Sequence, residues 1–193
     1  MGFRDDSGNP VVIPLIDDET NSTAKPASPT TGTVLLPTTD ANAATLNLTK
    51  DANGKYYIDV VFKPGATGTL DYASIIDSGA EFSAIFTRVD GTVVTLNLSG
   101  TPVGIVTVMN ADGTSSDVQV TAGSNDALVA ALKNQGVQRF RYEITSAGFA
   151  WSAGTLQVKF IAGSWGQTLG DGSAGLANVE ATETLSVQGV TAL

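Results

Sequence analysis

The sequence predicts an all-β fold, an antiparallel sandwich of two sheets with one short helix and an extended N-terminal arm. The chain has 193 residues, of which 42% are apolar and 21 are glycine, enough to fill a core and to form many tight turns. Apolar and polar residues alternate with a period of two, which is typical of strands that bury one face. These segments recur about every 8–12 residues between Gly, Asn and Asp turns, the spacing of a β-sandwich. A parallel sheet would instead need strands that are apolar on both faces.

Two segments give the clearest strand patterns. Lys55–Phe62 places Tyr56, Ile58, Val60 and Phe62 on one face, and Gln138–Thr145 turns Phe140, Tyr142 and Ile144 inward with Arg139 and Arg141 outward. The turn Asp90–Gly91 between two apolar runs predicts a hairpin. The other expected strands are Ala44–Thr49, Glu81–Val89, Thr92–Ser99, Val103–Met109, Asp117–Thr121, Thr155–Ala162 and a last one within Ala177–Val187.

One segment has helical rather than alternating spacing. In Ser124–Lys133 the apolar residues Leu128, Ala131 and Leu132 fall on one helical face. Either Ser124 or the next residue, an asparagine, is a suitable N-cap. We therefore expect a short helix between two strands, covering one end of the sandwich.

The N-terminal part differs from the rest in composition. Residues 22–37 hold three prolines among Ser, Thr and Ala, which is typical of an extended linker. We therefore assign residues 1–36 to an arm and 37–193 to the sandwich. The short apolar run Val11–Ile16 is interrupted by Pro14 and is too short to cross a bilayer. It is a candidate strand that pairs with its own domain or an adjacent subunit, or that closes a preceding repeat.

Charge and composition exclude several classes of function. Ten basic and 19 acidic residues give a net charge of −9, so the basic footprint of a nucleic-acid binder is missing and anionic membranes are unfavourable partners. There is no cysteine and no histidine, which removes disulfides, thiolate chemistry, the Ser–His–Asp triad and imidazole metal ligands. Glu180 and Glu183 are three residues apart, so a regular strand sends them to opposite faces and they do not form a glycosidase pair.

Two segments of the sequence are similar to a known group of repeats. The stretch from Leu70–Asp71 to Glu81–Phe82, and later Phe160–Trp165, resemble repeats of giant bacterial RTX-type adhesins and type-I-secreted calcium-binding surface proteins. Residues 2–10 look like the end of a preceding repeat, whereas 166–172 depart from the family's cation-binding loop. The resemblance implies an Ig-like sandwich, an extracellular bacterial location and neighbouring repeats or subunits of the same protein as partners.

Calcium is the cofactor that the resemblance and the composition imply. Hard oxygen ligands are what Ca²⁺ prefers, and several acidic side chains lie close together in the chain. Three candidate clusters are Asp5, Asp6 and Asn9; Asp17, Asp18 and Glu19; and Asp71, Asp77 and Glu81. The simpler interpretation of each cluster is a set of solvated turn residues that accept backbone hydrogen bonds.

The tryptophans offer an alternative class of ligand. Trp151 and Trp165 flank glycine-rich loops, and exposed tryptophans stack on sugar rings in carbohydrate-binding modules. In a sandwich, a tryptophan beside an alternating strand is more often part of the core. The sequence therefore predicts a non-enzymatic structural or adhesive repeat, with a strand-exchanging filament subunit and a glycan-binding module as alternatives.

Overall fold

The computed structural model describes residues 31–35, 50–51 and 53–187, which form an all-β antiparallel sandwich as the sequence predicts. One sheet has, in spatial order, β1 (Thr31–Leu35), β2 (Tyr57–Lys63), β8 (Arg139–Glu143), β6 (Val103–Met109) and β7 (Ser115–Gln119). The other has β11 (Ala181–Val187), β9 (Gly154–Phe160), β4 (Phe82–Arg88) and β5 (Val93–Leu96). A small ribbon pairs β10 (Gln167–Leu169) with β3 (Gly68–Leu70).

The predicted alternation places the core residues correctly. Ile58, Val60 and Phe62 of β2 are fully buried, as are Leu156, Val158 and Phe160 of β9 on the facing sheet. The predicted turn at Asp90–Gly91 joins β4 to β5, and Gly91 has the positive φ of 84° that such a tight turn favours. The expected strand Ala44–Thr49 lies outside the described residues.

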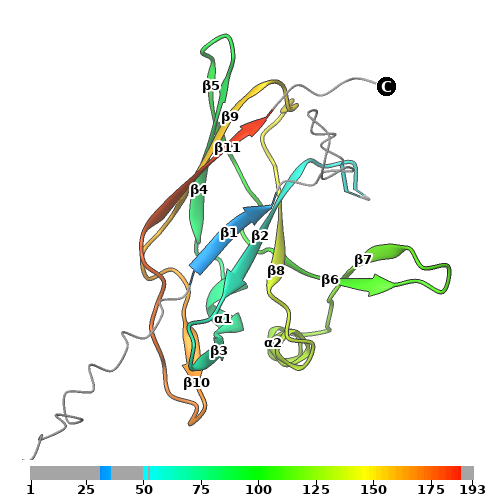
Figure 1. Ribbon diagram of the computed structural model, residues 1–193, viewed down its shortest axis with the longest axis vertical. Coiled ribbons are helices and arrows are strands. Elements are labelled where there is room, and N and C mark those ends of the chain that lie inside the picture. Colours follow the sequence, from blue (N-terminus) through cyan, green and yellow to red (C-terminus); the bar gives the residue numbers. More distant parts are fainter. Residues whose placement is uncertain (1–30, 36–49, 52, 188–193) are drawn as a thin grey trace, which may run out of the picture.

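The predicted helix is present as α2 (Asn125–Asn134), and a second, one-turn helix, α1 (Tyr72–Ile75), accompanies it. The Ser124 hydroxyl caps α2 by accepting a hydrogen bond from the Ala127 N–H at 3.3 Å. Leu132 is fully buried, and Figure 1 shows α2 at the lower end of β8, where it covers the end of the sandwich. Helix α1 was not expected because four residues are too few to show a period.

The end of the predicted arm belongs to the sandwich. Residues 31–35 form β1, which pairs with β2 from Thr31 opposite Lys63 to Leu35 opposite Asp59. Figure 1 shows β1 (blue) and β11 (red), the first and last described strands, side by side and pointing in the same direction. The hairpin of β6 and β7 projects from the opposite edge of the sheet.

Aromatic side chains from both sheets fill the space between them. The Trp165 ring lies 4.7 Å from that of Phe62 on one sheet and 5.4 Å from that of Phe160 on the other, in edge-on geometry. Phe82 of β4 and Tyr142 of β8 meet edge-on at 4.8 Å. Such pairs each stabilise a core by about 0.5–1.5 kcal/mol beyond their burial, so these contacts help to hold the two sheets together.

Candidate functional site

A buried carboxyl group lies between the two sheets, just before β4. The turn leading to it is fixed by Asp77, whose Oδ1 accepts a hydrogen bond from the Gly79 N–H at 2.5 Å. The carbonyl oxygen of Glu81 then accepts hydrogen bonds from the Ile161 N–H at 2.9 Å and the Ser164 hydroxyl at 3.2 Å. These contacts fix the backbone of Glu81 beside β9 and turn its side chain inward, where the residue is only 1% exposed.

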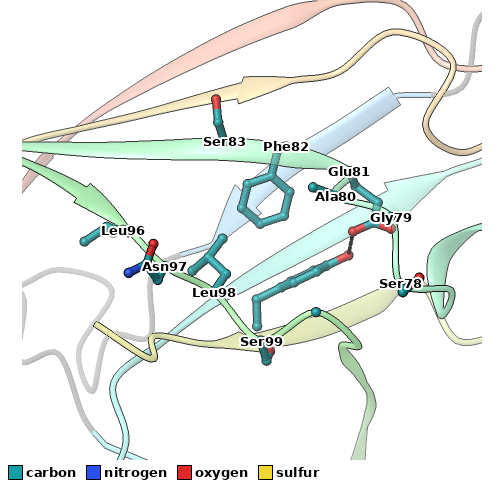
Figure 2. A pocket seen from close by; sticks show the side chains of 12 residues that line it. Ser78, Gly79, Ala80, Glu81, Phe82, Ser83, Leu96, Asn97, Leu98 and Ser99 are labelled. Atoms are coloured by element: carbon teal, nitrogen blue, oxygen red, sulfur yellow. Dashed lines mark hydrogen bonds between the residues drawn. The ribbon is translucent and has the colours of Figure 1, made fainter. Parts of the chain in front are cut away.

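The Glu81 carboxyl bonds to the opposite sheet. The Tyr142 hydroxyl of β8 donates a hydrogen bond to Glu81 Oε2 at 2.9 Å, drawn as a dashed line in Figure 2. The second oxygen, Oε1, is buried and has no hydrogen-bond partner among the described residues. One oxygen of this carboxyl is therefore satisfied and the other is not, which is an unfavourable arrangement for an ionised group.

Burial dominates the electrostatics of this pair. Desolvation raises the pKa of Glu81 to about 7. The hydrogen bond from Tyr142 and the backbone N–H of Glu81 itself act in the opposite direction, and the negative charge of Asp77 adds to the rise. Burial, together with the neighbouring carboxylate, also raises the pKa of Tyr142 well above its ordinary value. Burial therefore brings the pKa of Glu81 close to neutral pH.

A pocket of about 270 Å³ adjoins this carboxyl. Figure 2 shows Phe82 and Leu98 facing each other across it, with Ser78 and Ser99 at its rim. Its walls come from the turn before β4, from the segment that follows β5, and from Tyr142. The pocket thus opens between the two sheets, beside the Glu81–Tyr142 bond.

The third predicted calcium cluster is only partly assembled. Asp77 lies close enough to Glu81 to raise its pKa, but Asp71 is at the N-cap of α1, where its backbone oxygen accepts hydrogen bonds from Ser74. Among the residues that the structure describes, no group of three or more acidic side chains converges on a point. Glu81 Oε2 accepts a hydrogen bond from Tyr142, and calcium binding by Asp71, Asp77 and Glu81 stays a prediction.

The other two predicted calcium clusters lie outside the described residues. They are Asp5, Asp6 and Asn9, and Asp17, Asp18 and Glu19. The apolar run Val11–Ile16, predicted as a pairing strand, lies there too.

Both tryptophans are core residues, as the simpler interpretation of the sequence expects, and neither presents the exposed indole that the alternative of glycan stacking needs. Trp151 is 5% exposed and packs edge-on against Phe86 and Phe149, and Trp165 is 1% exposed. The reason is their position at the two ends of β9, where the sandwich is closed by aromatic residues. Neither indole offers a face to a sugar ring.

The sequence does not predict the ion-pair network that lies on the outer face of the five-stranded sheet. Arg141 of β8 donates two hydrogen bonds to Asp59 of β2, at 2.8 and 2.9 Å, and both residues are buried. The Arg141 guanidinium also lies 3.7 Å from the ring centre of Tyr57, and it reaches Asp117 of β7, which Arg139 contacts as well. Arg141 points outward as predicted, but its partners cover it.

The two edge strands β1 and β11 are joined by a side chain. The Val34 N–H of β1 points away from β2 and donates a hydrogen bond to Glu183 Oε2 of β11 at 2.8 Å. Gly32 lies so close to the core that a Cβ atom there would be 2.8 Å from Phe160 Cε1. The alternation of apolar and polar residues does not predict the Val34–Glu183 hydrogen bond, because it joins two edge strands that are about 150 residues apart in the chain.

Comparisons with family models, curated proteins and solved structures find no match for this chain. In the described part of the chain, neither helix has the length and apolar character needed to cross a membrane.

Proposed function

We propose that this chain is a non-enzymatic structural module of an extracellular bacterial surface protein, and that it carries tension between neighbouring modules or subunits. The observation that carries this proposal is the position of β1, which is held by β2 on one edge and by Glu183 of β11 on the other. The resemblance of residues 70–82 and 160–165 to adhesin repeats supports the extracellular location and the repeated partners.

The direction of the strands decides how tension would act. In Figure 1 the start of β1 lies well below the end of β11, and the two strands point the same way. Pulling on the chain before β1 and after β11 therefore slides β1 lengthwise along both neighbours. Hydrogen bonds between antiparallel strands are perpendicular to the strands, so this load acts on several of them together instead of opening them one by one. Resistance to such a load is a property suited to a mechanical module.

Single-molecule pulling on the whole chain tests this proposal. The chain has no cysteine, so one cysteine added at each end gives unambiguous attachment points. We expect Glu183→Ala to lower the unfolding force, because the Val34 N–H loses its acceptor and β1 is held on one edge only. Glu180→Ala, one residue before the same strand, is the matched control, since its ion pair with Lys159 joins two exposed side chains and contributes little.

Moving one attachment point tests the direction of the load. With Ala111→Cys at the tip of the β6–β7 hairpin and a cysteine at the C-terminus, the force no longer pulls along β1. We expect a lower unfolding force in this direction. Equal forces in the two directions, or an unchanged force in Glu183→Ala, would contradict the mechanical proposal.

Calcium enters the proposal through the acidic residues of positions 5–19, where bound cations would offset repulsion between carboxylates. The same pulling measurement in Ca²⁺ and then in EDTA tests this part. A higher force or a stiffer extension in Ca²⁺ supports it, and identical traces count against it. The calcium result is independent of the result for Glu183→Ala, because Glu183 lies in the sandwich and is not one of the acidic residues of positions 5–19.

A further inference from the structure

The Glu81–Tyr142 hydrogen bond joins the two sheets inside the sandwich. Glu81 precedes β4 of the four-stranded sheet, and Tyr142 lies in β8 of the five-stranded sheet. Both residues are at most 2% exposed, and both line the pocket of about 270 Å³. The charge state of Glu81 therefore bears directly on how the sheets are held together at this point.

Of the side chains that face the Glu81 carboxyl, only Tyr142 favours a negative charge, through its hydrogen bond. Tyr142 faces it from β8, Asp77 from the turn after α1, and the apolar Phe82 and Leu98 lie on the pocket side. Within the described residues, no lysine or arginine forms an ion pair with Glu81. The Ser164 hydroxyl binds the Glu81 backbone oxygen, not the carboxyl.

The neutral and ionised forms therefore differ sharply in this site. A protonated carboxyl keeps the bond to Tyr142 and has no charge to solvate. An ionised carboxyl leaves Oε1 without a donor and places its charge beside that of Asp77, a cost that only a shift of the turn 77–80 or water from the pocket would relieve.

We propose that Glu81 and Tyr142 form a proton-dependent latch between the two sheets, closed while Glu81 is protonated and weakened when it ionises, because the cost of the buried charge then exceeds the gain from a stronger bond to Tyr142. The sign follows from the raised pKa. Relative to the ordinary value of 4.5, the folded value of about 7 means that the full stabilising effect is present below about pH 4.5 and is lost as pH rises through 7. Acid conditions close the latch and neutral to alkaline conditions loosen it.

Four other described carboxyl groups have a pKa that is lowered instead of raised, so they ionise at lower pH than Glu81 does. The pKa values of Asp90, Asp112 and Asp171 are lowered, chiefly by hydrogen bonds from the threonine or serine two residues on. For Asp117, burial alone would raise the pKa, but the hydrogen bond and charge of Arg139 outweigh it and the pKa is lowered. These groups stabilise the fold above their ordinary pKa of 3.8 and lose that effect only on stronger acidification.

Thermal melting of the full chain between about pH 5 and about pH 8 tests the latch. We expect the Tm of the wild type to fall across this range and that of Glu81→Gln to stay nearly level, since glutamine keeps an acceptor for Tyr142 and cannot ionise. Glu180→Gln, which removes an exposed carboxylate, is the control and should retain the wild-type slope. Asp77→Asn, which keeps an acceptor for the Gly79 N–H, should move the transition to lower pH, because without the repelling charge of Asp77 the Glu81 carboxyl ionises more easily.

Parallel pH profiles for the wild type and Glu81→Gln, or a wild-type Tm that rises toward pH 8, would overturn the proposal. If Glu81→Gln does not fold, carbon-13 NMR of the glutamate carboxyl groups in the wild type gives the answer directly. A Glu81 signal that titrates near neutral pH supports the latch, and one that titrates near its ordinary value overturns it. None of these results depends on the pulling experiments, because the Val34–Glu183 contact is not involved.

Discussion

Gly32 sets how closely β1 approaches the aromatic core. Its backbone faces Phe160, and an added Cβ atom would lie 2.8–2.9 Å from two ring carbons. We expect Gly32→Ala to destabilise the protein by about 1–3 kcal/mol, because either the phenyl ring or β1 must move. The free energy of unfolding in urea measures this effect.

Gly100→Ala is the matched control, since no atom lies within 4 Å of the added methyl group and no positive φ is involved. That variant should be neutral or slightly stabilising through its less flexible unfolded state. If both variants lose the same stability, the close approach of β1 to Phe160 does not limit the packing.

At the level of single residues, the sequence predicts which side chains are inward but not what they contact. Phe140, Tyr142 and Ile144 are buried as the alternation requires. The burial of Glu81 could not be predicted, because a carboxyl group in a turn is normally exposed to solvent. Its burial depends on Tyr142, some sixty residues further on in the chain. The family resemblance of this segment implies a calcium ligand at Glu81, which stays a prediction, and it gives no sign of the hydrogen bond from Tyr142.

At the level of elements, strands with several alternating residues were predictable and the three-residue strands were not. β2, β4, β6, β8 and β9 were located within a few residues of their observed ends. β3 and β10 have three residues each, too few for a pattern, and exist because they pair with each other. β1 lies in a segment of linker composition, and its strand form depends on β2 and Glu183.

The contact of α2 with the sheet gives an element-scale prediction. An alanine methyl group at Gly104 of β6 would overlap Leu132 Cδ2 of α2, so helix and sheet meet in close contact there. We expect Gly104→Ala to cost about 1–3 kcal/mol by overpacking and Leu132→Ala to cost about 2–5 kcal/mol by leaving a cavity. The double variant should lose less stability than the sum, because the new methyl group occupies part of the cavity.

A double-mutant cycle from urea denaturation measures this coupling. Pairing Gly104→Ala with Val34→Ala, in a strand at the other edge of the sheet, provides the control, and those two losses should add. Additive losses for the Gly104–Leu132 pair would mean that α2 does not pack on the sheet as described.

At the scale of the whole molecule, one aromatic core joins the two sheets from end to end. Trp151 precedes β9 and packs on Phe86, whereas Trp165 follows β9 and packs on Phe62 and Phe160. The fold class was predictable because alternation and turn spacing are repeated along the chain. The continuity of the core was not predictable, because it depends on contacts between aromatic residues that are far apart in the sequence.

This continuity predicts cooperative unfolding. The two tryptophans lie at opposite ends of the seven-residue strand β9, so each reports on a different end of the sandwich. Trp151→Phe leaves Trp165 as the only indole, and Trp165→Phe leaves Trp151, since the chain has two tryptophans. Because both ends share one core, fluorescence and far-ultraviolet circular dichroism should give the same urea midpoint within each variant. A fluorescence midpoint that departs from the circular dichroism midpoint in either variant would show that one end opens separately, and the sandwich would then have two units of stability instead of one.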